Sequence, residues 1–364
     1  MNLQNDNNNT GQYPLYLGGE LGLIDNVNET YPQIAKLRDE LMRNQWDWRE
    51  ISLAKDAFDI QNPALGSATL GMTRNIEFQY ATDSLVAVSI AQVMGNYCSN
   101  SELLGALQQW EFQEYVHSMQ YSEIAKKAYK DPNFLLNGIK LNDLLIERLQ
   151  PFVDILDECR KKSFDYALGY DNYTEEEHRL SILRFHFCLL ALEGIAFAGS
   201  FAATFGVCKA AKAYDGIKNA IQLITRDELD THVRLGVTIL SILKAEWAEE
   251  YVVAATEAEE LFSVVYDLEK RWSTEYLFKD ISIRGLNPGL MDDYTLYLMG
   301  AICNAVGVNY NYRPVEENPL PFMDEYLNIG DIQVAAQESQ LVSYNVNILD
   351  DDIDPTEIFD FDFK

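Results

Sequence analysis

Residues 110–121, WEFQEYVHSMQY, decide the fold and supply the first candidate site. Glu114 and His117 lie three residues apart, so at about 100° per residue both project from nearly the same face of a helix. A carboxylate and an imidazole on one face can share a metal ion. A single pair of this kind arises readily by chance, with a prior of about one in ten of binding metal. Its weight depends on what the rest of the chain supplies.

A second pair follows in residues 225–232, TRDELDTH. Glu228 and His232 are four residues apart, and this spacing also brings both side chains to one helix face. A second ion could be held there. Thr225 with Glu228 also fits a capping box, in which case Glu228 would only mark a helix start.

Two further acids, Asp83 in YATDSLVA and Glu193 in ALEGIAF, lie inside otherwise apolar helical stretches. Burial raises the pKa of such a carboxyl and neutralises it unless a cation compensates, so acids in these places indicate a metal. Two Glu and His pairs with two lone acids on two other helices match the ligand arrangement of ferritin-like dimetal bundles. Carboxylate oxygen with a little imidazole suits iron or manganese.

The periodicity of apolar residues divides the chain into three parts. Residues 1–26 are rich in Asn and Gly and form an irregular segment, whereas in residues 27–310 apolar residues recur three and four apart, which predicts an all-α, ferritin-like bundle of long helices. Prolines and acidic residues then predict that residues 311–364 form an extended C-terminal tail, expected to be disordered.

Helix starts are predicted at Ser99 with Glu102 and at Thr174 with Glu177, each spaced as a capping box. Five cysteines are scattered without a CxxC pair, which predicts buried or idle thiols.

The net charge limits the classes of partner. The 28 basic and 57 acidic residues give a formal charge of −29, which opposes both nucleic acid and an anionic membrane. The N-terminus carries no leader pattern, and no apolar stretch of about 18 residues occurs, so we expect a cytoplasmic protein that spans no membrane. The two other histidines are expected on the solvated surface, for His178 in a charged run, and in the core, for His186.

Together these segments resemble the small subunit of class I ribonucleotide reductase over roughly residues 30–364. The resemblance implies a homodimer that carries two metal ions per chain, with iron expected and manganese or a mixed pair as alternatives. The positions that match the family's six metal ligands are Asp83, Glu114, His117, Glu193, Glu228 and His232. Tyr121, seven residues after Glu114, matches the tyrosine that the family oxidises to a stable radical.

The resemblance also implies a pocket and a route for the radical. Phe197, Phe201 and Ile224 match the apolar residues that surround the family's radical, although ordinary core packing explains them equally well. The residues that match the transfer route are Trp46, Asp227, Tyr344, Glu50 and Glu338.

Within that route, Trp46 is preferred to Trp48 because it precedes Asp56 by ten residues, as in the family. Asp227 matches the acid that links this tryptophan to the metal-bound imidazole of His117. The last residues, EIFDFDF, resemble the peptide that docks on the large subunit.

One departure from the family concerns His232. The family has Glu and His three residues apart in this helix, whereas RDELDTH contains one residue more. A local π-bulge would absorb it; alternatively, Asp230 or Thr231 would face the metal in place of His232.

These observations favour a radical-generating subunit of ribonucleoside-diphosphate reductase. A reduced dimetal centre would activate O2, Tyr121 would lose an electron and a proton, and the radical would pass to a large subunit that reduces ribonucleotides to deoxyribonucleotides. The centre would need a reductant for its activation. Two alternatives stay open: a self-contained dimetal oxidase or hydroxylase, which needs a substrate pocket beside the metals, and a ferritin-like metal-binding protein.

Overall fold

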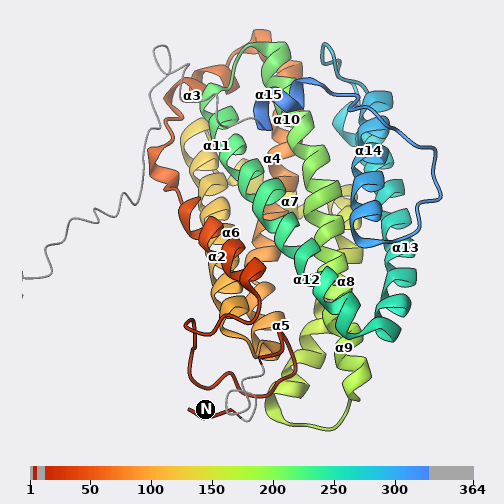
Figure 1. Ribbon diagram of the computed structural model, residues 1–364. Coiled ribbons are helices and arrows are strands. Elements are labelled where there is room, and N and C mark those ends of the chain that lie inside the picture. The colour runs from red at the N-terminus through yellow and green to blue at the C-terminus, as the bar shows by residue number, and fades with distance from the viewer. Residues whose placement is uncertain (1–2, 6–12, 328–364) are drawn as a thin grey trace, which may run out of the picture.

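The computed structural model describes residues 3–5 and 13–327, and in these ranges the chain forms helices and no strand. Long helices run side by side in one bundle (Figure 1), so the expected all-α, ferritin-like fold is confirmed. The helices are α2 (Pro32–Arg43), α3 (Ala54–Ile60), α4 (Gly66–Ala87), α5 (Ile90–Tyr97), α6 (Ser101–Ala128), α7 (Asn133–Lys140), α8 (Asp143–Leu168), α9 (Glu175–Ala191), α10 (Ala198–Ala211), α11 (Asp215–Arg226), α12 (Val233–Glu246), α13 (Ala248–Arg271), α14 (Pro288–Val306) and α15 (Phe322–Leu327).

Three π-helical segments continue α-helices without a break. They are η3 (Leu192–Phe197) between α9 and α10, η4 (Asp227–His232) between α11 and α12, and η5 (Trp272–Leu277) after α13. Two short 3₁₀ turns, η1 (Trp48–Glu50) and η2 (Pro63–Leu65), lie in the connections around α3. The bundle's centre is formed where α4, α6, the α9–η3–α10 helix and the α11–η4–α12 helix pack together.

The α9–η3–α10 helix forms the middle of the core. This run, Glu175–Ala211, is long and apolar enough to cross a membrane, but 94% of its most apolar window is buried inside the bundle. Neighbouring helices therefore take the place of lipid as its apolar surroundings.

Local capping explains where several helices begin. The capping box of Thr174 and Glu177 is present at the start of α9, as predicted. The box predicted at Ser99 and Glu102 is wrong: Asn100 caps α6 by accepting from the amide of Leu103 at 2.8 Å, and the Ser99 hydroxyl donates to a carbonyl of the N-terminal segment. Asn can cap as well as Ser, so the spacing alone did not distinguish the two positions.

The histidines outside the predicted pairs are both buried. His186 is a core residue, as expected, and its Nε2 lies 2.7 Å from the hydroxyl of Tyr16. The prediction for His178 is wrong, because this residue is 5% exposed and its Nδ1 lies 3.1 Å from the hydroxyl of Tyr97. A charged run at a helix start covers only the outward face, and His178 projects inward from it. All five cysteines are buried and free, as expected.

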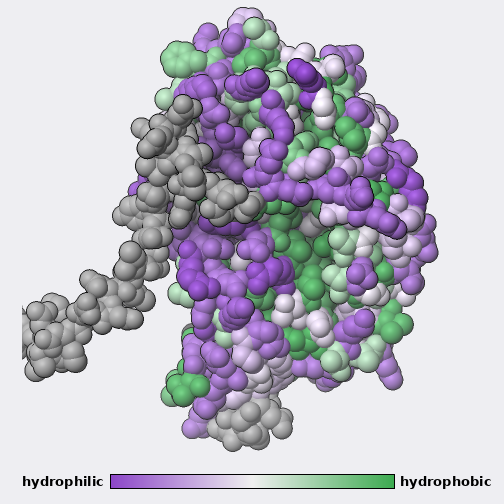
Figure 2. Space-filling model, turned by 45° about the horizontal axis from the view of Figure 1, so that its top comes forward, coloured by the Kyte–Doolittle hydropathy of each residue, from purple (hydrophilic) through white to green (hydrophobic). Residues whose placement is uncertain are grey.

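Segments that flank the bundle also contribute to its core. The described residues before α2, 3–5 and 13–31, form no helix or strand, yet Leu15 is fully buried. After α14, residues 307–327 run back over the bundle, where Leu320 and Met323 are buried. The rest of the predicted tail, 328–364, lies outside the described residues. Figure 2 shows a largely hydrophilic face around a strip of hydrophobic residues, in keeping with the excess of acidic side chains.

Candidate metal centre

The structure brings all six predicted ligand residues together in the centre of the bundle, and each is at most 2% exposed. They come from four helices. Asp83 lies on α4, Glu114 and His117 on α6, Glu193 on η3, and Glu228 with His232 on η4.

Two overlapping groups make up this cluster, and within each group the potential ligand atoms lie within 4.8 Å of one another. One group is Asp83, Glu114, His117 and Glu228, and the other is Glu114, Glu193, Glu228 and His232. Glu114 and Glu228 belong to both. Two carboxylates shared between two sets of ligands give the geometry of a carboxylate-bridged pair of ions.

The nearest contacts in the cluster link its imidazoles to the shared carboxylates. Nδ1 of His117 lies 3.0 Å from Oε1 of Glu228 and 3.7 Å from Oδ2 of Asp83. Nδ1 of His232 lies 3.1 Å from Oε1 of Glu114 and 3.2 Å from Oε2 of Glu228. Both rings therefore turn Nδ1 toward the cluster.

Unpaired buried atoms show that these residues fit a pair of metal ions. The cluster contains several buried atoms without a hydrogen-bond partner: Asp83 Oδ2, Glu114 Oε2, His117 Nδ1, Glu193 Oε1 and Glu228 Oε1. Leaving such atoms unsatisfied is costly, and more so for charged groups. Four ionised carboxylates would carry four negative charges, which two divalent cations balance. The donor set of oxygen with a little imidazole nitrogen suits iron or manganese.

The electrostatics of the cluster also favour bound cations, because burial opposes the ionisation of its carboxyl groups. Burial, followed by the charges of Glu114 and Glu228, raises the pKa of Asp83 well above its usual range. Burial and the charge of Glu228 do the same to the pKa of Glu193. Burial also opposes ionisation of Glu114, but the neighbouring imidazoles of His117 and His232 outweigh it and hold the pKa of Glu114 at about 2. Cations in the cluster would stabilise all the carboxylates as anions.

The extra residue of RDELDTH is absorbed by η4, which spans Asp227–His232 and is π-helical. The π-bulge that the longer spacing predicted is therefore present, and His232 rather than Asp230 turns into the cluster. The capping alternative for Glu228 is wrong, because Thr225 lies inside α11 and its hydroxyl donates to the carbonyl of Ile221 at 2.6 Å.

Asp227 connects the cluster to the loop after α2. Its Oδ2 lies 3.2 Å from Nε2 of His117 and accepts a hydrogen bond from Nε1 of Trp46 at 2.7 Å. Its Oδ1 accepts from the guanidinium of Arg226 at 2.8 Å. Trp48 makes no such contact with Asp227; the guanidinium of Arg49 covers its ring. The structure thus places Trp46, the tryptophan chosen from its spacing, beside His117.

Tyr121 is fully buried on α6, one turn beyond His117, and its hydroxyl has no hydrogen-bond partner. Burial, and after it the charge of Asp83, raises the pKa of this phenol well above its usual range. The rings of Phe197 and Phe201 pack 4.7 Å apart, and Ile224 is fully buried. These residues belong to the same dry core.

Sequence reasoning missed three residues beside the cluster. Gln113 accepts through its Oε1 from Nε2 of His232 at 2.9 Å, and Trp110 donates from Nε1 to Oε1 of Glu114 at 3.0 Å. The ring of Tyr80 stacks 5.9 Å from that of Tyr121. The only available signal was their helical spacing from Glu114 and Asp83. Of the remaining predicted residues, Glu50 ends the exposed turn η1, and two, Glu338 and Tyr344, lie outside the described residues.

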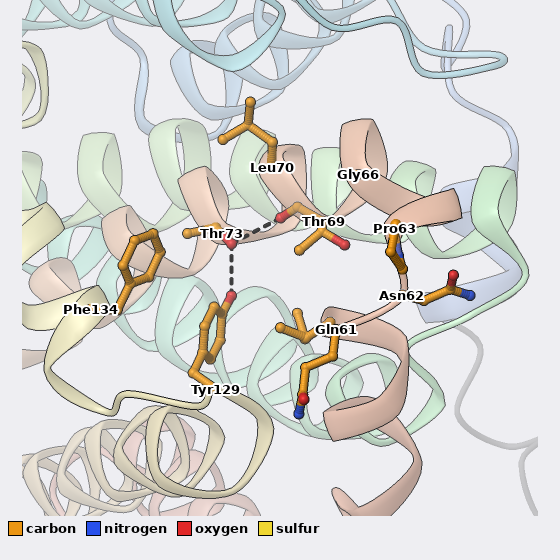
Figure 3. Close-up of a pocket in the computed structure, with 10 residues that line it drawn as sticks. Gln61, Asn62, Pro63, Gly66, Thr69, Leu70, Thr73, Tyr129 and Phe134 are labelled. Atoms are coloured by element: carbon orange, nitrogen blue, oxygen red, sulfur yellow. Dashed lines mark hydrogen bonds between the residues drawn. The ribbon is translucent and has the colours of Figure 1, made fainter.

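Two surface pockets in the described part of the chain lie away from the cluster, and none of the six candidate ligands lines either. One opens between the η2 region and the start of α7 (Figure 3), where the hydroxyl of Tyr129 lies 2.9 Å from that of Thr73 and Phe134 forms an apolar wall. The other lies between α2 and the first turns of α6.

Comparison with known proteins agrees with this geometry. The family model for the ribonucleotide reductase small chain matches residues 24–319. The chain belongs to this family. The expectation of a class I ribonucleotide reductase small subunit is therefore confirmed.

Relatives in the family extend over nearly the whole chain. The ribonucleoside-diphosphate reductase subunit beta of Haemophilus influenzae is 28% identical over 363 residues, 96% of this chain and 95% of that protein. The protein of the same name from enterobacteria phage T4 is 27% identical over 373 residues, 96% of this chain and 95% of that protein.

Solved structures share the fold. A chain described as a class I ribonucleotide reductase from Bacillus halodurans superimposes with a TM-score of 0.70 at 22% identity, covering 81% of this chain and 99% of that one. The dimanganese(II) form of the NrdF protein of Streptococcus sanguinis gives a TM-score of 0.65 at 17% identity, covering 83% and 98%.

Proposed function

We propose that this chain generates a radical at Tyr121 for the reduction of ribonucleotides by a separate large subunit. The observation that carries the proposal is the buried cluster of six potential ligands with unpaired atoms facing one another, on helices that also carry Tyr121. One ion would be held by the group Asp83, Glu114, His117 and Glu228, and a second by the group Glu114, Glu193, Glu228 and His232. When bound, the metal pair supplies the activation of O2.

The protein's own groups define what happens at Tyr121. Oxidation to a neutral radical removes one electron and, from Oη, one proton. Because the pKa of Tyr121 lies well above its usual range, the phenol keeps its proton until the electron leaves. Burial of the Tyr121 ring in the core that also contains Phe197, Phe201 and Ile224 would exclude water and reductants and so prolong the life of the radical.

For transfer out of the core, we propose the hydrogen-bonded chain His117–Asp227–Trp46. Asp227 fixes the tautomer of His117 by accepting from Nε2 and leaves Nδ1 free to bind metal. Trp46 is partly exposed, so its ring joins this chain to the surface. Beyond it, Glu50, Glu338 and Tyr344 remain the residues proposed for exchange with the large subunit.

Oxygenation of the metal-loaded protein tests the radical. The full-length apo protein is loaded with Fe(II) and exposed to O2, after which iron is counted and the electron paramagnetic resonance spectrum recorded. Wild type should hold two irons per chain and show a tyrosyl signal. Tyr121→Phe should keep both irons and lose the signal, and Tyr170→Phe, at an exposed tyrosine after α8, should keep both the irons and the signal. A signal that survives Tyr121→Phe would overturn the assignment.

Iron is the metal we propose, and manganese or a mixed pair would use the same donors. The same count separates this function from metal storage, which predicts many ions per chain. Loading apo protein with either metal alone and comparing radical yields identifies the active form.

We propose two protein partners and a cytoplasmic location. The large subunit would bind the C-terminal tail, so deletion of residues 345–364 should abolish that binding without changing the metal content; a self-contained oxidase would be unaffected. A second copy of the chain would cover the exposed Phe112 and Tyr115 of α6, and sedimentation should show a homodimer.

A further inference from the structure

Gln113 determines which ring nitrogen of His232 faces the cluster without a hydrogen. It lies on α6 immediately before Glu114 and is 1% exposed. Its Nε2 donates to the backbone carbonyl of Leu41 at 3.1 Å, and its Oε1 lies 2.9 Å from Nε2 of His232. Turning the amide over would set its carbonyl oxygen against that of Leu41, so the orientation is determined by the backbone.

The tautomer of His232 follows from this orientation. A carbonyl oxygen can only accept, so Nε2 of His232 must carry the hydrogen that is donated to Gln113. An imidazole that binds a metal ion is neutral and has one N–H, so Nδ1 of His232 would present its lone pair to the ion. This is the atom that faces Glu114 at 3.1 Å and Glu228 at 3.2 Å. Gln113 thus prepares His232 as a metal ligand.

The corresponding partner of His117 differs in charge. There Nε2 faces Oδ2 of Asp227 at 3.2 Å, a carboxylate that Arg226 and Trp46 also hold in place. An anionic acceptor makes an imidazole a more basic ligand than a neutral amide does. The two ends of the cluster therefore offer imidazoles of unequal strength.

A second contact reduces the donor capacity of Glu114 on the side of His232. Nε1 of Trp110 donates to Oε1 of Glu114, the oxygen on the side of His232, at 3.0 Å. Oε2 of Glu114, on the side of His117, has no hydrogen-bond partner. The shared carboxylate is thus left with more of its donor capacity at the His117 end.

We propose that Gln113 is the positioning residue for the His232 end of the site, and that its neutral amide makes this end the weaker metal position, filled after the His117 end. The inference rests on the dimetal function proposed above and adds an order of loading. Asp227 plays the corresponding part at the stronger end.

Binding of Mn(II) to the full-length apo protein without oxygen tests the inference, with free Mn(II) measured by electron paramagnetic resonance. Wild type should bind two ions per chain with separable affinities. Gln113→Met, which removes the acceptor at similar size, should weaken the weaker class by roughly 10–100-fold and leave the tighter class unchanged. Gln113→Glu gives His232 an anionic acceptor, as Asp227 is for His117, and should tighten the binding of the weaker ion.

Two further variants complete the test. Asp227→Asn gives His117 a neutral partner as well. This variant should weaken the tighter Mn(II) position and reduce the difference in affinity between the two positions. Gln108→Met, at an exposed glutamine of α6, should change the affinity of neither position.

Equal affinities of the two positions in wild type, or loss of the tighter position in Gln113→Met, would overturn the inference. Failure of the wild type to bind any Mn(II) would instead overturn the dimetal function; if Gln113→Met does not fold, Asp227→Asn alone decides between these outcomes.

Discussion

Trp46 and Asp227, which are 181 residues apart in the chain, share a hydrogen bond of 2.7 Å from the indole Nε1 to Oδ2. The same oxygen faces His117, and the Trp46 and His117 rings stack with centroids 6.1 Å apart. These contacts link the buried cluster to the partly exposed loop after α2.

Substitution of Trp46 should separate radical formation from radical use. In Trp46→Phe the ring volume is largely kept but the N–H donor and the easily oxidised indole are lost. We expect Tyr121 to be oxidised in near-normal yield, with deoxyribonucleotide formation by the complex with the large subunit falling at least a hundredfold. Trp48→Phe is the matched control and should retain turnover. The opposite pattern would place the route through Trp48.

Removal of one acid from the cluster should have opposite effects on the apo and metal-loaded protein. Glu193 is 2% exposed, and its Oε1 has no partner without metal. Glu193→Met, which removes the unpaired oxygen at similar length, should therefore stabilise the apo protein by roughly 1–3 kcal/mol. The increase in melting temperature on adding Fe(II) should shrink, because a ligand is lost. Calorimetry with and without metal measures both changes, and a less stable apo variant would contradict the expectation.

Removing one partner of the buried ion pair of Arg148 and Glu269 should be strongly destabilising. Its N–O distance is 2.6 Å, Arg148 lies between the rings of Phe78 and Trp272, and it also donates to the carbonyl of Ala196 in η3. Arg148→Met leaves Glu269 buried without a cation and should cost about 3–5 kcal/mol in urea unfolding.

The double variant Arg148→Met with Glu269→Leu controls for that cost. It removes the uncompensated charge and should recover most of the lost free energy of unfolding. If the double variant is as unstable as the single one, the loss comes from the ring contacts of Arg148 and not from its charge.

Stability should fall in acid through His186. Burial lowers the pKa of His186 to about 3, against about 6.5 in the unfolded chain. Between these values the unfolded state binds the proton and the folded state does not, so this contribution is complete above pH 6.5 and is lost as the pH falls. The slope of the unfolding free energy against pH should approach about 1.4 kcal/mol per pH unit, which corresponds to one bound proton. His186→Gln should reduce the slope of unfolding free energy between pH 6.5 and 5; parallel slopes would exclude this cause.

The sequence was most informative where one helix carries both members of a pair. Glu114 and His117 could be placed on one face because α6 is regular around them. For His232 the spacing indicated an irregular turn but left open which residue faces the metal. The structure shows that the turn is the π-helical segment η4. The second π turn, η3, left no sign in the sequence, because Glu193 is its only charged residue and there was no spacing to compare.

Contacts between distant helices could not be predicted. Nothing in the periodicity of α6 indicates that Gln113 meets Leu41, or that Tyr80 of α4 stacks on Tyr121. The error at His178 has a similar origin, since its burial depends on Tyr97 from α5. Periodicity gives the direction of a side chain from its own helix, and packing decides what it meets.

The two kinds of helix in the centre have a mechanical consequence. Asp83 and Glu114 stand on regular α-helices, whereas Glu193 and Glu228 stand on π turns that contact each other. A π turn is held by wider i→i+5 rings than a regular α-helix. Bound ions would therefore be held by regular helices on one side and by π turns on the other, so we expect Glu193 and Glu228 to accommodate changes in ionic radius or charge while the α-helices that carry Asp83, Glu114 and Tyr121 keep their shape.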